Sequence, residues 1–553
     1  MSSAVAGLAQ VGLLVVALAA VYGPFGAYLA GVYSSDRHWR VERVLYRLVG
    51  VDPDAEQRWG AYAAGVLGFS FVSIVLLYVL QRVQAWLPWN FGRGPVEPGI
   101  AFNTAVSFAT NTNWQSYVPE EVLGHTVQMA GLTVQNFVSA AVGMAVAVAL
   151  VRGFARANAD RLGNVWVDIT RGVIRVLLPL SFAAAVVLVA LGAAMSLAPG
   201  IAVTGLDGQT HVIATAPIVS QEAIKELGTN GGGVLNANSA HPFSNPNGWT
   251  NLFETFLLLV VPVSLTRTFG IMVGDRRQGH AILSVMGLVW VVMLSVAWWA
   301  ETHPNGPATL AAGAAMEGKE TRFGIPASVL WAISTTGTST GAVNSMHDSF
   351  TGLGGGMALL NMLLGEVAPG GVGSGLYGIL VLAVIAVFLA GLMVGRTPEY
   401  LGKKLGRREV TAAAIAILAM PAVVLLGTGA ALALPSTVDA MNNTGAHGLS
   451  EVLYAYASAG NNNGSAFAGI TATNDFFQST LGIAMLLGRF VPILAVLALA
   501  GSLAAQKRIP VSAGTLPTSG PLFVGLLTGT VVLVAALTFL PALALGPIAE
   551  ALA

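Results

Sequence analysis

This chain contains no cysteine and few charged residues. With no cysteine, disulfide bridges, thiolate metal sites and thiol catalysis are excluded. Only 9% of the 553 residues are charged, whereas a soluble globular protein carries roughly 25%. The formal net charge is zero, so the composition gives no reason to expect nucleic acid or an acidic surface as a partner. Because 55% of the residues are hydrophobic, we expect an all-α polytopic membrane protein.

Long apolar segments make up much of the sequence. A transmembrane helix needs about 20 mostly apolar residues, and ten segments meet this requirement. They are 7–32, 59–85, 122–151, 173–198, 250–274, 280–300, 355–395, 410–434, 476–504 and 519–546. No Lys or Arg precedes the first segment, and its first following cation is Arg37, so no signal peptide is evident.

The distribution of arginine and lysine predicts the orientation of these helices. Most of the 26 cations fall in alternate connections, namely 33–58, 152–175, 267–277, 396–408 and 507–508. Cytoplasmic loops carry the excess of Lys and Arg in membrane proteins. We therefore expect a multi-pass protein with both termini outside. Reading the same clusters as lipid or nucleic-acid patches is the weaker interpretation.

Four outer connections share a short helical stretch followed by small polar residues. They read "FNTAVSFATNTNWQSY" (102–117), "SQEAIKELGTNGGGVLNANSAHPF" (220–243), "IPASVLWAISTTGTSTGAVNSMHD" (325–348) and "LSEVLYAYASAGNNNGSAFAG" (449–469). When Asn113, Gly231, Gly341 and Gly464 are aligned, the spacings are 118, 110 and 123 residues. A near-constant period with one spanning helix before and one after each stretch indicates an internal fourfold repeat.

The repeat divides a single membrane domain, 1–553, into six parts. They are a first helix with its cytoplasmic loop (1–57), pore repeats 1 to 4 (58–160, 161–279, 280–408 and 409–510) and a last helix (511–553). The expected fold has ten transmembrane helices. Four pseudo-symmetric helix–pore-loop–helix repeats surround a central cation filter, and the first and last helices are additional.

The chemistry of the four loops predicts a path for a monovalent cation. Non-helical backbone is tolerated at membrane depth only where it is buried in protein or lines a wet cavity. Four loops around one axis can aim carbonyl oxygens at the centre, where they replace the hydration shell of an ion. Glycine allows a close approach. No Asp or Glu occurs in 110–117, 228–240, 333–346 or 458–474, which disfavours a divalent ion. The predicted filter residues are Asn111, Thr112, Asn113, Thr229, Asn230, Gly231, Ser339, Thr340, Gly341, Asn462, Asn463 and Gly464.

These stretches resemble the potassium-binding A subunit of the bacterial Kdp potassium-transporting P-type ATPases. The similarity is carried by "TNTNWQSY", "ELGTNGGG", "NANSAHPF", "GAVNSMHDSF", "YASAGNNNGSAFAG" and "LLGRFVPI", which together cover the whole chain. The resemblance implies a bacterial inner-membrane protein that selects K⁺ from outside and passes it through an intramembrane tunnel to a P-type ATPase B subunit. It also implies a C subunit, a small single-span F subunit and membrane lipids as partners, and no nucleic acid.

The chain has no recognisable place to hydrolyse ATP. It contains neither a G-x-x-x-x-G-K-[ST] phosphate loop nor the Asp-Lys-Thr-Gly sequence of P-type pumps, and its cytoplasmic loops are short. We therefore expect a non-hydrolytic subunit with no cofactor of its own, whose partner B subunit uses ATP and Mg²⁺. One alternative is a stand-alone or regulated potassium channel-like transporter of the same superfamily. A membrane-embedded enzyme is the other, and only Glu366 and Arg489 stand out for it.

Three residues other than the filter residues are predicted to lie on the ion path. Gln115 either faces the pore axis at the outer side of the filter or supports the first loop by hydrogen bonds. Glu366 lies in "LLGEVAPGGVGSG" (363–375), where proline and glycines should break the seventh span. It is predicted to be a cation way-station at a gate or the partner of a basic residue. Arg489, in mid-span, is predicted to form the floor below the filter or to pair with backbone carbonyls or an acid such as Glu366.

Three histidines, His241, His347 and His447, lie in outer loops. Histidine is a common metal ligand, but these three are scattered along the chain. We therefore expect ordinary polar positions rather than a metal site.

Overall fold

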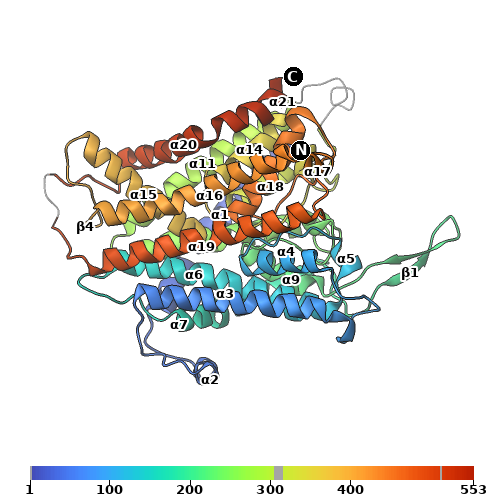
Figure 1. Cartoon of the computed structure of the whole chain (residues 1–553), viewed down its shortest axis with the longest axis horizontal. Helices are drawn as coiled ribbons and strands as arrows, with labels where there is room; N and C mark the ends of the chain where they lie inside the picture. Colours follow the sequence, from blue (N-terminus) through green and yellow to red (C-terminus); the bar gives the residue numbers. More distant parts are fainter. Residues whose placement is uncertain (1–2, 304–314, 511–513, 553) are drawn as a thin grey trace.

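The computed structural model describes residues 3–303, 315–510 and 514–552. Within these residues, ten helices are long and apolar enough to cross a membrane, as predicted, and they lie side by side in one bundle (Figure 1). They are α1 (Ser3–Ser34), α3 (Trp59–Arg82), α6 (Val134–Ala155), α8 (Leu178–Ala190), α10 (Gly248–Met272), α11 (Arg276–Thr302), α15 (Ser374–Met393), α16 (Arg407–Ala433), α19 (Asp475–Ala505) and α20 (Pro521–Leu543). The third and fourth spans begin earlier, at Val127 and Val165, through short π-helical turns and α7 (Val165–Arg171).

Four half-helices enter the bundle from one end. They are α4 (Pro98–Ala109), α9 (Ile218–Leu227), α13 (Gly324–Gly337) and α18 (Gly445–Asn461). With 10 to 17 residues, they extend about 15–25 Å, less than the roughly 30 Å hydrocarbon thickness of a bilayer. One half-helix falls in each predicted pore repeat, and each ends at one of the polar loops. The helix–pore-loop–helix architecture is therefore confirmed.

The seventh span is broken, as its proline and glycines predicted. α14 (Gly352–Leu363) ends before the irregular stretch 364–373, and α15 begins after it. Gly373 adopts φ +89°, and a Cβ there would lie 2.0 Å from the carbonyl oxygen of Gly143 in α6. The break can therefore approach the neighbouring helix only because residue 373 has no side chain.

Burial separates central helices from peripheral ones. In the most apolar window of each span, 83% of the residues are buried in Val127–Ala155 and 72% in α10, but only 11% in α1. The core therefore sits around α6 and α10, and α1 lies at the edge, as expected for an additional first helix. Small residues allow the close helix packing that membrane proteins require: a Cβ at Gly153 of α6 would lie 2.7 Å from the carbonyl oxygen of Ala500 in α19.

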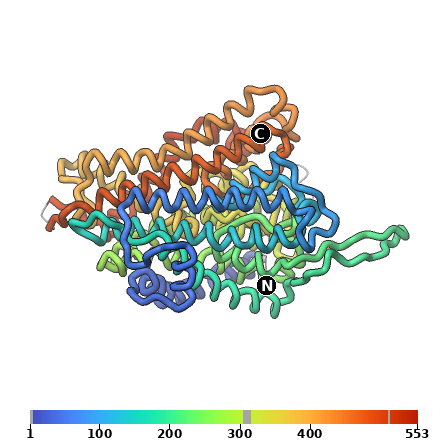
Figure 2. The backbone as a smooth tube through the Cα atoms, turned by 60° about the horizontal axis from the view of Figure 1, so that its bottom comes forward, coloured from blue at the N-terminus to red at the C-terminus, as the bar shows by residue number. Residues whose placement is uncertain are grey.

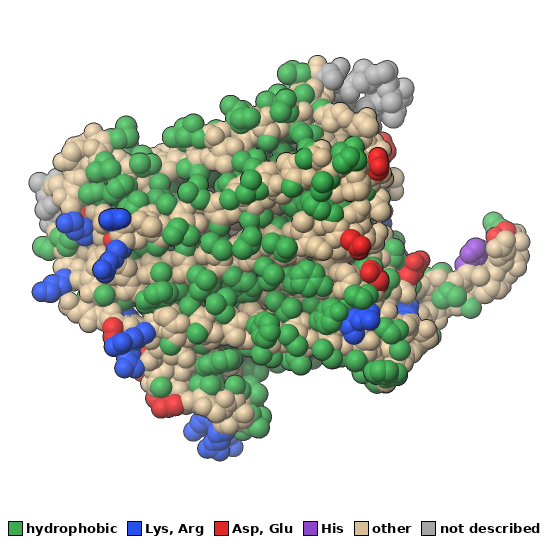
Figure 3. All heavy atoms as spheres, in the orientation of Figure 1, with side chains coloured by type: hydrophobic (Ala, Val, Ile, Leu, Met, Phe, Trp, Pro, Cys, Tyr) green, Lys and Arg blue, Asp and Glu red, His purple; other side chains and the backbone are tan. Residues whose placement is uncertain are grey.

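The two ends of the bundle differ in charge and in loop structure. Lys and Arg gather at the end near α2 (Arg40–Val49) and the hairpin of β3 (Glu399–Tyr400) and β4 (Lys403–Lys404) (Figure 3). Both termini lie at the opposite end, with the half-helices (Figure 1). From that end projects the antiparallel hairpin of β1 (Ile201–Thr204) and β2 (Thr210–Ile213) (Figure 2). The short helices α5 (Pro119–Val122), α17 (Pro435–Val438) and α21 (Ala549–Leu552) lie there too.

Candidate functional site

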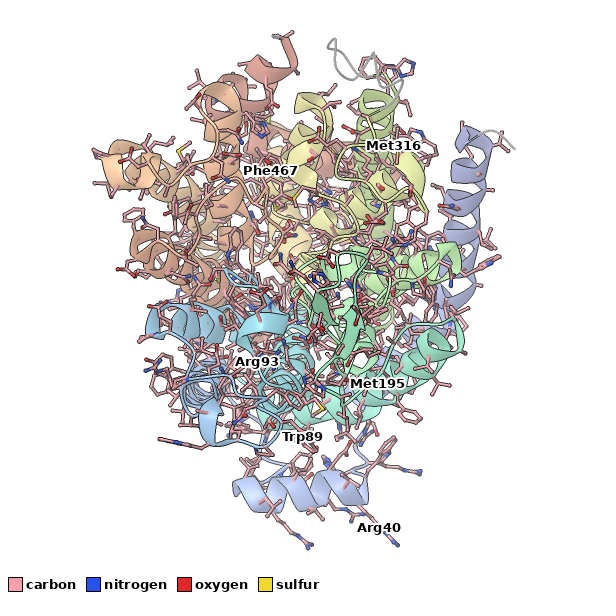
Figure 4. All side chains as sticks on the ribbon, turned by 90° about the vertical axis from the view of Figure 1, so that its right-hand side faces the viewer. Arg40, Trp89, Arg93, Met195, Met316 and Phe467 are labelled. Carbon is pink, nitrogen blue, oxygen red and sulfur yellow. The ribbon has the colours of Figure 1, made fainter. Side chains whose placement is uncertain are left out.

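The four polar loops form a closed ring, which we call the filter ring. Figure 4 looks onto the pore-loop end: Arg93 of repeat 1, Met195 of repeat 2, Met316 of repeat 3 and Phe467 of repeat 4 occupy its four quarters. A Cβ added to a loop glycine would collide with a carbonyl oxygen of the next loop. The pairs are Gly231 with Thr340 (2.7 Å), Gly341 with Asn463 (2.3 Å), Gly464 with Thr112 (2.0 Å) and Gly232 with Asn113 (3.0 Å). Each loop thus touches its neighbour, in the order 2, 3, 4, 1 and back to 2.

The same backbone turn follows each half-helix. Two residues before each aligned position, the chain adopts a left-handed conformation, at Asn111 (φ 66°), Thr229 (47°), Ser339 (51°) and Asn462 (60°). The next residue in each loop donates its N–H to a carbonyl five residues earlier. These bonds are Thr112 to Ser107 (2.9 Å), Asn230 to Lys225 (2.8 Å), Thr340 to Thr335 (3.2 Å) and Asn463 to Ser458 (2.8 Å). Non-glycine residues rarely adopt positive φ, so the shared turn supports the alignment by period.

Carbonyl oxygens without donors are the chemical signature of the ring. Among the described residues, no hydrogen-bond donor reaches the carbonyl oxygen of any predicted filter residue except Thr229, whose oxygen accepts from Asn111 Nδ2 at 2.8 Å. Almost all of these residues are buried. Buried carbonyls normally have a partner, and a dehydrated cation would supply one here. The ring itself contains no carboxylate, which suits a monovalent ion.

The asparagine side chains brace the loops. Asn230 Nδ2 donates to Asn111 Oδ1 at 2.5 Å, which joins loops 2 and 1. Asn113, which stands where the other loops have glycine, donates from Nδ2 to Oδ1 of Asn136 in α6 at 3.0 Å. Asn462 Nδ2 donates to the Thr112 hydroxyl, also at 3.0 Å. The amide nitrogens are therefore engaged with protein groups, whereas Asn230 Oδ1 has no hydrogen-bond partner among the described residues, so the oxygens free for an ion include the backbone carbonyls and this amide oxygen.

Gln115 bridges loops 1 and 2 at the outer end of the ring. Its Oε1 accepts from Gly233 N at 2.8 Å, and its Nε2 lies 3.2 Å from the Gly233 carbonyl oxygen and 3.1 Å from the Tyr117 hydroxyl. Both ends of the amide are therefore engaged in contacts that join loop 1 to loop 2. Its effect on the ion stays a prediction.

Glu366 lies directly behind loop 3. Ser339 Oγ donates to Glu366 Oε2, and the residue is 2% exposed. Its other oxygen, Oε1, has no hydrogen-bond partner among the described residues. The broken span therefore brings one carboxylate to the inner edge of the filter ring.

A cavity of about 120 Å³ lies below loops 3 and 4, between α15, α16, α19 and α20. Ser339, Asn462, Tyr377 and Arg489 line it. Arg489 is 5% exposed, and no ion pair within 4.0 Å joins it to Glu366 or to any other described acid. The alternative in which Arg489 pairs with Glu366 is therefore not the arrangement in this structure. Arg489 instead borders the space beneath the filter ring.

A charged group that the sequence patterns did not single out lies behind loop 2. Lys225 is buried in α9, with its Nζ 2.7 Å from Glu222 Oε2 and 3.6 Å from Glu226 Oε1. The available signal was the segment "EAIKEL", which carries three charges in a half-helix that the repeat places inside the protein.

The outer histidines also have partners that their sequence positions did not indicate. His447 Nδ1 lies 2.9 Å from Glu550, and its Nε2 lies 3.1 Å from Asp348 and 3.7 Å from Glu451. Hydrogen bonds to Asp348 and Glu550 raise the pKa of His447 to about 10. The charged imidazole therefore ties repeat 3, repeat 4 and the last helix together at the pore-loop end.

Comparison with known proteins gives consistent results. Residues 12–552 match the family described as "Potassium-transporting ATPase A subunit". A relative from Rhodococcus opacus named "Potassium-transporting ATPase potassium-binding subunit" is 62% identical, with both chains fully covered. One of the same name from Streptomyces coelicolor is 60% identical, again with full coverage. The crystal structure of the potassium transporter TrkH from Vibrio parahaemolyticus matches 77% of this chain and 83% of its own with a TM-score of 0.52 at 15% identity, which shows a shared fold.

Proposed function

The chain belongs to the potassium-transporting ATPase A subunit family, and from this premise we propose that its filter ring binds K⁺ through backbone carbonyl oxygens. It is the potassium-binding subunit of a potassium-transporting ATPase. The observation that carries the binding site is the set of buried carbonyl oxygens without donors, arranged in four equivalent turns. Neutral oxygens that replace the hydration shell favour K⁺ over more strongly hydrated ions.

The four loops differ in the carbonyl oxygens that they leave free for an ion. The carbonyl of Thr229 is already engaged by Asn111, whereas those of its equivalents Asn111, Ser339 and Asn462 have no donor among the described residues. At this level the ring is therefore fourfold in backbone shape but not in available oxygens. We expect the best-formed K⁺ site at the level of Thr112, Asn230, Thr340 and Asn463, where all four carbonyls lack a donor.

Below the ring, Glu366 and Arg489 direct the ion sideways. A dehydrated cation that leaves loop 3 meets the carboxylate of Glu366 first, and the guanidinium of Arg489 then opposes straight passage towards the basic end. The cavity between α15, α16, α19 and α20 borders this point, and we propose that it forms the start of a lateral route. That route would deliver K⁺ through an intramembrane tunnel to a P-type ATPase B subunit.

The name of the relatives supports a complex with an ATPase. The partners that we propose are the B subunit, which uses ATP and Mg²⁺, a C subunit and a small single-span F subunit. The clustering of Lys and Arg at one end (Figure 3) supports a bacterial inner-membrane orientation with that end in the cytoplasm and both termini outside.

The direct test is to purify the chain under a tag placed on it alone and to measure ATP hydrolysis at increasing K⁺. We expect a P-type ATPase chain to copurify and hydrolysis to rise with K⁺. A chain that purifies alone and conducts K⁺ without ATP would instead be a stand-alone transporter. A complex whose ATP hydrolysis ignores K⁺ would refute the proposal.

A further inference from the structure

One position in the half-helices breaks the fourfold pattern. Three half-helices place a hydroxyl at the residue whose carbonyl receives the N–H of the following loop: Ser107, Thr335 and Ser458. In α9 the equivalent residue is Lys225, which is fully buried. Burying a charged side chain without partners costs free energy. We therefore expect Lys225 to have polar partners behind loop 2.

In repeats 1 and 3 the hydroxyl ties the loop to its own half-helix. Ser107 Oγ donates to the carbonyl oxygen of Trp114 at 3.0 Å, seven residues later. Thr335 Oγ1 donates to the carbonyl oxygen of Ala342 at 2.7 Å, again seven residues later. Each bond holds the outer end of the loop, just beyond the aligned position.

In repeat 2 the same task falls to two residues. The carbonyl seven residues after Lys225 belongs to Gly232, and it accepts from Asn238 Nδ2 at 2.5 Å. Asn238 Oδ1 in turn lies 3.3 Å from Lys225 Nζ. An ammonium can only donate, so Lys225, together with the Ser239 N–H that donates to the same oxygen at 2.9 Å, holds Oδ1 on its side and leaves the NH₂ group for Gly232.

The same amide reaches the next loop. Asn238 Oδ1 also accepts from the backbone N–H of Val343 in repeat 3, at 3.1 Å. Asn238 itself adopts a left-handed φ of 55°, which needs support from its surroundings. Lys225 therefore holds, through one asparagine, the outer rim of loops 2 and 3.

This link sits where loop 2 departs from the others. In repeats 1, 3 and 4 the aligned residues Asn113, Gly341 and Gly464 have positive φ, but in repeat 2 it is Gly232, one residue later. The remaining donors of Lys225 go to Glu222 Oε2 and Ser239 Oγ, both at 2.7 Å. The adjacent carboxylates balance the ammonium, so it can brace the loop without repelling the ion.

We propose that Lys225 is a positioning residue of the filter: by fixing Asn238 it sets the shape of loops 2 and 3, and hence K⁺ affinity and discrimination, without touching the ion. This inference rests on the proposed function of the filter ring. It is distinct from a merely structural role, in which Lys225 only neutralises Glu222 and Glu226.

The test uses the intact complex and measures ATP hydrolysis against K⁺ and against Rb⁺. Asn238→Ala leaves the Lys225–Glu222 pair in place but cuts its connection to Gly232 and Val343. We expect the apparent KM for K⁺ to rise about tenfold, as for a lost charge-supported hydrogen bond, with kcat little changed and the preference for K⁺ over Rb⁺ reduced. Asn236→Ala, an exposed asparagine two residues earlier, is the matched control and should behave as wild type.

Lys225→Met removes the ammonium itself and should change KM and the Rb⁺ preference in the same direction. If that variant does not fold, Asn238→Ala decides alone. A folded Asn238→Ala complex whose KM and ion preference stay within about twofold of the wild type would overturn the inference. If ATP hydrolysis by the wild-type complex did not respond to K⁺, the proposed function itself would be refuted. The two failures are therefore distinguishable.

Discussion

Gly341→Ala is the sharpest test of the filter ring, because the structure defines what the added methyl group would meet. The Cβ would lie 2.3 Å from the carbonyl oxygen of Asn463 and 2.8 Å from the backbone of Gly464. Both are backbone atoms of the neighbouring loop, which cannot rotate away as a flexible side chain would. Gly341 also has φ +76°, where a residue with a Cβ costs roughly 1–2 kcal/mol. Loop 3 or loop 4 must therefore move, and with it a carbonyl oxygen of the ring.

A loss of about 1.4 kcal/mol in ion binding corresponds to tenfold in affinity, and we expect at least that for Gly341→Ala. The assay is K⁺-stimulated ATP hydrolysis of the intact complex, with thermal unfolding as a check of the fold. Gly525→Ala in α20 is the control, because no described atom outside the adjoining stretch of its own helix lies within 4 Å of the added Cβ and alanine favours a helix. If folded Gly341→Ala kept wild-type K⁺ dependence, the carbonyls of loops 3 and 4 would not form the ion site.

Three further predictions concern the surroundings of the ring. Gln115→Arg should place a cation beside the ion path and raise the apparent KM for K⁺ about tenfold or more; an unchanged KM would exclude a position near the ion. Arg489→Ala should make the resting complex leak K⁺ in a vesicle flux assay. A leak no greater than that of the wild type would refute the proposal that Arg489 blocks the path below the filter ring. His447 is stabilising while protonated. Because its pKa in the folded protein is raised to about 10 from an ordinary value near 6.5, its contribution is complete below about pH 6.5 and is lost as pH rises through about 10. His447→Gln should therefore lower the midpoint of thermal unfolding at pH 6.5, by the equivalent of about 1–3 kcal/mol, and less at pH 10.5; a gap that widens with pH would contradict this.

Prediction from the sequence succeeded where the physical cause is local. Hydropathy revealed the ten spans, and proline with glycine revealed the break at 364–373, because both act within a few residues of chain. The period of the loops located four equivalent turns, which the left-handed residues Asn111, Thr229, Ser339 and Asn462 now mark in space. The predicted role of each filter residue in binding K⁺ stays a prediction for the experiments above.

What composition and period determined by themselves was a bundle with a ring of small polar residues at its centre. Only the tertiary structure decided which oxygens remain free in that ring. Asn111 occupies the carbonyl of Thr229 from 118 residues away, and the partners of His447 include Glu550, 103 residues further on. In the sequence Lys225 has only Glu222 and Glu226 as charged neighbours, and folding alone brings Asn238 between it and Gly232. Such pairs depend on the directions of side chains from separate segments, which no local pattern encodes.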